Sequence, residues 1–298
     1  MSPWAFHPHL AAWAVVVAVG LSYLALVHRG LRAHLGGQHA HADEASMRPT
    51  PRQWWQLAGG LVGLAAAVTW PVADLAAHWS LTALLVQRLL LMLVVAPLLL
   101  LAVPVPVWAR LTRPPVVDAA VDFLSRVPVA IVTFTVIVVG TLTVPAVAAQ
   151  SSSAGWRALF DALLLFAGFV LWVPALGRVP GARRPSSVGR AVYLVVQSIL
   201  PNFPAVVFVF SRHPLYSAFV HAHRAIAISA LNDQQLAGIV AKVGTLPVLW
   251  TAAWRALSRA ERTERLGVDE EPLTWAEVER ALQREERAER RSGRPAAG

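Results

Sequence analysis

Long apolar runs separated by short polar segments dominate the sequence. Seven of these runs approach the ~20 residues that an α-helix needs to cross a bilayer. They occupy residues 10–27, 53–72, 81–103, 127–148, 156–176, 191–211 and 234–256. The pattern predicts an all-α, polytopic membrane protein: a seven-transmembrane-helix bundle over residues 1–257, followed by a charged tail over residues 258–298.

Two other segments are helical in pattern but too polar to span a membrane. Residues 114–126 carry apolar residues on one face and Asp118 and Asp122 on the other, which predicts an amphipathic helix on the inner membrane surface. In the tail, Thr274 and Glu277 form a capping box that opens a helix. The mixed charges of this helix favour a solvated surface, with a partner-binding helix as the alternative.

The basic residues are distributed unevenly among the polar segments. Arg is concentrated in loops 28–52, 109–126 and 177–190 and in the tail, whereas loops 71–80 and 149–155 contain no Arg or Lys. Because cytoplasmic loops carry the excess of basic residues, this alternation predicts an N-terminus outside and a C-terminus in the cytoplasm. The same asymmetry accounts for the net charge of +9, so no nucleic-acid partner is expected.

Composition agrees with the membrane class and removes several kinds of chemistry. The chain is 56% hydrophobic and only 14% charged, with a mean hydropathy of +0.53. It contains no cysteine, which excludes disulfides, thiolate metal sites and thiol redox chemistry. We find no Walker loop, no GxSxG and no HExxH, and no spacing that pairs a nucleophile with a base, so an enzyme is not expected.

Three charged residues lie within the apolar runs: Arg88, Asp161 and Lys242. A charge in hydrocarbon costs roughly 2.5–3.5 kcal/mol on insertion scales, so such residues usually face the protein interior and are paired. All three fall at a similar depth below the outer ends of their helices, and Arg157 lies one turn before Asp161. We therefore predict a buried ion-pair cluster that joins the third, fifth and seventh spans. A proton or ion relay, or a metal-handling site, is the alternative.

Six histidines fall on the predicted outer side of the membrane: His7, His9, His78, His213, His221 and His223. Imidazole is a good ligand for copper and zinc, and two histidines in H-x-H spacing can converge on one ion. His78, His221 and His223 are the candidate metal ligands in these external loops. The alternative is that they are solvated loop histidines.

Two stretches of the sequence resemble the CtaG-type family of cytochrome c oxidase assembly proteins. Residues 71–83 read Pro-Val-Ala-Asp-Leu-Ala-Ala-His-Trp-Ser-Leu-Thr-Ala, and Gln87 follows shortly afterwards. Asp233, Gln234 and Gln235 begin a DQQLAG box at the head of the last span. The order and spacing of these motifs extend the resemblance over about residues 50–257.

The resemblance implies a non-enzymatic assembly factor for a haem-copper cytochrome c oxidase, located in the bacterial plasma membrane. It further implies contact with oxidase subunits and copper handling at the external face. The family typically carries membrane-embedded histidines at positions that here hold Leu84, Arg88, Thr143, Arg157 and Asp161.

The loss of these histidines makes this chain a divergent member. We expect an Arg88–Asp161 salt bridge, with Lys242 nearby, where the histidine site would be. Copper is the only cofactor that the resemblance brings into consideration. The alternatives are a degenerate paralogue with a scaffolding role and no metal, and a small transporter, which the apolar inner halves of the spans disfavour.

Overall fold

The computed structural model describes residues 7–32, 48–220, 228–266 and 282, and every regular element in these ranges is a helix. The helices are α1 (Leu10–Arg32), α3 (Pro51–Val68), α4 (Val72–Asp74), the π-helix η1 (Leu75–Trp79), α5 (Leu81–Leu89), the π-helix η2 (Leu90–Val95), α6 (Ala96–Ala102), α7 (Val105–Leu111), α8 (Pro115–Leu124), α9 (Val127–Gly140), α10 (Val144–Ser152), α11 (Ala154–Leu176), α12 (Ser187–Ile199), the 3-10 helix η3 (Leu200–Asn202), α13 (Phe203–Phe210), α14 (Ser217–Val220) and α15 (Ala230–Leu266).

Five of the described helical segments are long and apolar enough to cross a membrane, and two bent helix pairs raise the number to as many as seven. The five are Leu10–His28, Leu81–Ala102, Ala154–Leu176, Ser187–Phe210 and Ala230–Arg262. The bent pairs are Pro51–Val68 with Val72–Trp79, and Pro115–Leu124 with Val127–Gly140. The predicted all-α, multi-span class is therefore confirmed, with five to seven spans.

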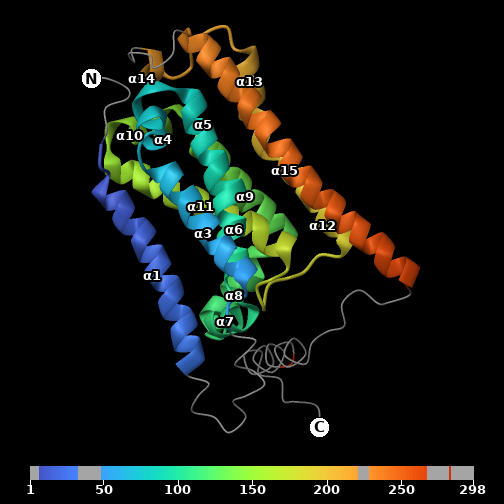
Figure 1. Ribbon diagram of the computed structural model, residues 1–298. Coiled ribbons are helices and arrows are strands. Elements are labelled where there is room, and N and C mark those ends of the chain that lie inside the picture. Colours follow the sequence, from blue (N-terminus) through green and yellow to red (C-terminus); the bar gives the residue numbers. More distant parts are fainter. Residues whose placement is uncertain (1–6, 33–47, 221–227, 267–281, 283–298) are drawn as a thin grey trace, which may run out of the picture.

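The predicted amphipathic segment is the helix α8, which meets α9 at an angle of 82°. No residue of α8 is buried, and at the bend the Ser125 hydroxyl accepts a hydrogen bond from the Arg183 backbone N–H at 2.8 Å. Asp122 pairs with Arg126 at 3.1 Å and with Arg183 at 3.1 Å. These contacts tie α8 to the loop before α12, at the end of the bundle where α7 also lies (Figure 1).

The third span runs continuously through α5, η2 and α6, and it widens into a π-helix ahead of Pro97. Proline has no N–H and its ring crowds the preceding turn, so a local widening relieves the helix. In η2 the Ala96 N–H donates to the Leu91 carbonyl, which leaves the Met92 carbonyl without its usual helical partner. The Trp172 indole N–H of α11 donates to this Met92 carbonyl at 2.9 Å.

The core lies around this span. Leu91, Val95 and Ala96 have no exposed surface, and Ala167 and Leu171 of α11 are equally buried. Gly168 allows the close approach of these helices, because a Cβ on it would lie 2.6 Å from the Ala96 Cβ. The long helix α15 packs along α12, α13 and α5 (Figure 1).

Two predictions about the C-terminal part are affected by the structure. Helix α15 continues to Leu266, past the predicted end of the membrane domain at residue 257. The tail helix predicted to begin near Thr274 lies outside the described residues, as do His221 and His223.

Candidate functional site

Polar side chains gather at the end of the bundle where α5, α11 and α15 begin. We call this set the polar layer; it consists of His7, His9, Asp74, His78, Ser80, Gln87, Arg88, Thr141, Gln150, Arg157, Asp161, Asp233 and Gln234. In Figure 1 it corresponds to the end that carries α4, α10 and α14, opposite α7 and α8. The layer contains most of the site residues expected from the sequence, but several of its bonds differ from those we predicted.

Arg88 is the most deeply buried charge of the layer, with 2% of its surface exposed. Its guanidinium Nη1 donates to the Thr141 hydroxyl at 2.6 Å, and its Nη2 donates to the Thr141 carbonyl at 2.8 Å and to Gln150 Oε1 at 3.0 Å. Thr141 caps the C-terminus of α9, and Gln150 belongs to α10. The side-chain amide of Gln150 also donates to the Thr141 carbonyl at 3.1 Å. Arg88 thus fastens α5 to the α9–α10 turn through neutral acceptors.

Asp161 is half-buried and accepts its hydrogen bonds from Gln87. The Gln87 amide donates to the two carboxylate oxygens at 3.2 and 3.4 Å. Gln87 is itself buried, so this bond joins α5 to α11 next to the Arg88 bonds. A cavity of only about 10 Å³, roughly the space of one water molecule, lies between Gln87, Gln150, Arg157 and Asp161.

The predicted salt bridge between Arg88 and Asp161 is therefore wrong as a direct contact. Within the described part of the chain, no ion pair within 4.0 Å joins Asp161 to Arg88, Arg157 or Lys242. Arg88 is bonded to the neutral side chains of Thr141 and Gln150, and Asp161 is bonded to the neutral amide of Gln87. Lys242 is exposed on α15 and does not join the layer, because its position faces away from the bundle.

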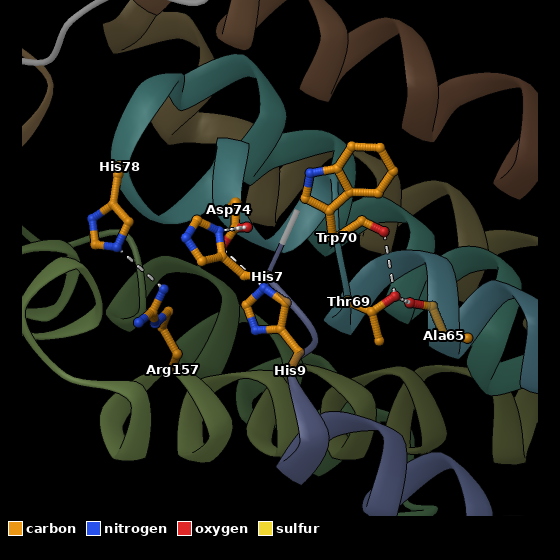
Figure 2. A network of polar contacts seen from close by, with 8 residues as sticks. All are labelled: His7, His9, Ala65, Thr69, Trp70, Asp74, His78 and Arg157. Atoms are coloured by element: carbon orange, nitrogen blue, oxygen red, sulfur yellow. Dashed lines mark hydrogen bonds and ion pairs between the residues drawn. The ribbon is translucent and has the colours of Figure 1, made fainter. Parts of the chain in front are cut away.

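The N-terminal segment contacts the layer through His7 and His9, which Figure 2 shows beside Asp74. Asp74 accepts from both histidines: His7 Nδ1 lies 2.9 Å from one carboxylate oxygen and His9 Nε2 lies 2.9 Å from the other. His78 is exposed, and its Nε2 lies 3.4 Å from Arg157 Nη1. Asp74 has the role of an acceptor for two imidazoles, which the sequence did not reveal because the partners are more than 60 residues apart.

The two sequence motifs that carry the family resemblance contact each other directly. The Asp233 carboxylate of the DQQLAG box accepts from the Ser80 hydroxyl at 2.8 Å, from the Leu81 N–H at 2.7 Å and from the Thr82 N–H at 3.3 Å. The Thr82 hydroxyl returns a bond to the Asp233 carbonyl at 2.9 Å. The first N–H groups of a helix have no partner within the helix, so a carboxylate placed there stabilises it.

The next residue of the box, Gln234, is 2% exposed and holds the loop before α14. Its Oε1 accepts from the Leu215 N–H at 2.7 Å, and its amide donates to the His213 carbonyl at 3.4 Å. Gln235 is half-buried and makes no side-chain hydrogen bond within the described ranges. Gly238 lies against α13, where a Cβ would come 2.6 Å from the Ala205 carbonyl oxygen. The box is therefore a joint between α15 and its neighbours.

These features define a polytopic helical membrane protein whose polar residues are bonded to one another at one end of the bundle. The chain belongs to the cytochrome c oxidase caa3 assembly factor family, which it matches over residues 21–262. The match includes both motifs and all of the described helices except the first half of α1 and the last turn of α15. No curated protein and no solved structure matches the sequence.

The residues at the expected histidine positions do not fit a copper ion. Copper prefers imidazole and sulfur ligands, whereas Arg has no lone pair to offer and Leu84 is apolar. Asp161 alone could act as a ligand, and its oxygens are already hydrogen-bonded to Gln87. Among the described residues, no group of three or more His, Cys, Asp or Glu is arranged to hold a metal ion.

Proposed function

We propose that this protein is a non-enzymatic maturation factor for a haem-copper cytochrome c oxidase in the bacterial plasma membrane, and that it acts by contact with oxidase subunits. Membership of the assembly factor family over residues 21–262 is the observation that carries the proposal. The bonded polar layer supports a role in holding a rigid binding surface, because most of its hydrogen-bonding groups, such as those of Asp233, Gln87 and the terminal nitrogens of Arg88, are paired within the protein itself.

We further propose that copper is not coordinated inside the bundle. The chemistry of Arg88 and its neighbours supports this, since hydrogen bonds to Thr141 and Gln150 occupy the site. His7 and His9 at the rim are paired with Asp74, and His78 faces Arg157. A bound cation at either place would have to displace an existing partner.

The test is deletion of the gene, followed by difference spectra of the oxidase in membranes grown with and without added copper. We expect loss of the oxidase signal that copper does not restore and that a plasmid copy of the gene does restore. Rescue by copper alone would instead assign copper delivery to the protein. An unchanged oxidase signal would contradict the proposed function and leave a scaffolding role in another process.

A further inference from the structure

The structure contains a second cavity, which Arg88 lines and Asp161 does not, between the third span and the break η3 that interrupts the helix pair α12 and α13. It measures about 40 Å³, which is room for roughly three water molecules. Its walls come from α5, η2, α9, α12, η3, α13 and α15, and they include Arg88, Phe134, Gln197, Asn202, Phe208 and Thr245. Arg88 is the only charged residue among the lining residues.

Two of the lining residues have a buried polar atom without a hydrogen-bond partner in the described part of the chain. They are Nε of Arg88 and Oε1 of Gln197. Gln197 has no exposed surface, and its orientation is fixed because its amide donates to the Tyr193 hydroxyl at 3.1 Å and to the Ala130 carbonyl at 3.5 Å. A buried donor or acceptor left unpaired costs about 1–3 kcal/mol, so a ligand that pairs with either atom would stabilise the folded protein.

The charge of Arg88 determines the kind of ligand. All of its hydrogen bonds within the protein go to neutral oxygens of Thr141 and Gln150. Asp161, the carboxylate expected to neutralise it, is bonded to Gln87 and lines a different cavity. Asp161 therefore acts on Arg88 only through space and not by a hydrogen bond. A buried cation is stabilised by a hydrogen-bonded counter-charge, so an anion that accepts from Nε would supply the bond that the described part of the protein lacks.

We propose that this cavity binds a small monoanion, of the size of chloride or of a single carboxylate group. The Arg88 Nε–H donates to the anion, and a water molecule beside it donates to both the anion and Gln197 Oε1. The volume admits such an ion with one or two waters and excludes larger anions such as gluconate.

The anion that binds in the cavity can come from two sources. Chloride or another free ion would come from water, whereas the carboxylate of a fatty acid would come from the bilayer. The break η3 is where a fatty acid would approach, because Pro201 and Asn202 line the cavity while the adjacent Leu200 and Phe203 are 47% and 70% exposed on the outside of the bundle.

The first experiment measures the thermal unfolding midpoint of the full-length protein in detergent as chloride replaces gluconate at constant ionic strength. We expect a saturable upward shift with chloride, because an ion that binds only the folded state stabilises it. The second arm removes lipid and adds palmitate, and native mass spectrometry looks for a fatty acid on the protein as purified. A shift with palmitate and none with chloride assigns the bilayer as the source.

Variants make the test specific. Arg88→Lys keeps the charge and removes the Nε–H, so the affinity for the anion should fall by about tenfold or more, as expected for loss of one hydrogen bond to a charged group. Lys242→Gln is the matched control: it removes an exposed cation of α15 that does not line the cavity and should leave the response unchanged.

If Arg88→Lys does not fold, the unmodified protein still decides the matter through the size series chloride, bromide, iodide and gluconate. Equal responses to all four anions would overturn the proposal, as would the absence of a saturable response to both chloride and palmitate. A response that Lys242→Gln abolishes would overturn it as well, and the cavity would then hold water alone.

Discussion

At the residue scale, Asp233 contributes to the bundle by capping a helix that begins about 150 residues earlier in the chain. Asp233 as a whole is 9% exposed. Its carboxylate accepts from the Ser80 hydroxyl and from the N–H groups of Leu81 and Thr82. A local capping residue can be predicted from the sequence, because it stands directly before the helix that it caps. A cap that comes from a distant part of the chain, as Asp233 does for α5, leaves no such local pattern in the sequence.

Replacement of Asp233 by Ala should lower the free energy of unfolding by ~2–3 kcal/mol, since it removes a cap and leaves buried N–H groups unpaired. Thermal unfolding in detergent measures the effect. The adjacent Asn232 is exposed and its side chain caps nothing in the described part of the chain, so Asn232→Ala serves as the control and should change stability by less than ~0.5 kcal/mol. Equal losses for the two variants would argue against the cap.

The two glutamines of the DQQLAG box give a second comparison. Gln234→Ala leaves the Leu215 N–H without its acceptor and should cost about 1–3 kcal/mol of stability. Gln235→Ala removes a side chain of the same size without a hydrogen bond among the described residues, and we expect a clearly smaller loss. Chemical denaturation of the two variants side by side checks the order, and a larger loss for Gln235→Ala would refute the assignment.

At the scale of the elements, the third span depends on a neighbouring helix to complete its hydrogen bonds. The π-helix η2 leaves the Met92 carbonyl without a helical partner, and the Trp172 indole of α11 supplies one. In a membrane no water is at hand to replace a lost partner, so the widened turn and the tryptophan stabilise the span together.

Trp172→Phe should therefore destabilise the protein by about 1–3 kcal/mol while it keeps an aromatic ring at the position. Trp254→Phe is the control, because Trp254 of α15 is 70% exposed. Unfolding followed by circular dichroism compares the two variants. If Trp172→Phe were as stable as Trp254→Phe, the Met92 carbonyl would have another partner in the membrane.

The sequence was informative about the elements and much less so about the bonds of the site. Periodic apolar runs determine where helices lie, so most spans and α8 were predicted close to where the structure has them. The run 127–148 is the exception, because the structure ends α9 at Gly140 and begins α10 at Val144. Arg88 and Asp161 were identified as buried from the same pattern, but their partners were not. Thr141, Gln150 and Gln87 are neutral, and a neutral side chain gives no sign in the sequence that it will replace a counter-charge.

At the scale of the whole molecule, the orientation in the membrane follows from the distribution of Arg and remains a prediction. The natural absence of cysteine makes a direct measurement simple, because a single introduced cysteine is the only thiol. Ser152 is exposed at the end with the polar layer, and Arg113 is exposed at the opposite end, in the α7–α8 loop.

We expect a membrane-impermeant maleimide to label Ser152→Cys in intact cells. Arg113→Cys should be labelled only after the membrane is permeabilised, because the positive-inside distribution places it in the cytoplasm. Labelling with a permeant maleimide confirms that both cysteines are reactive. The opposite pattern would reverse the predicted topology without affecting the fold.

The joint between Asp233 and the start of α5 has a consequence for biosynthesis. The ribosome makes Ser80 early, but Asp233, which accepts from Ser80 and from the first N–H groups of α5, emerges only with the last described helix, α15. Until then, the N–H groups of Leu81 and Thr82 must find water or a substitute partner. The part of the polar layer that Asp233 forms can thus assemble only when the last span arrives, and a chain truncated before α15 would leave these two N–H groups unpaired for the quality-control machinery of the cell to detect.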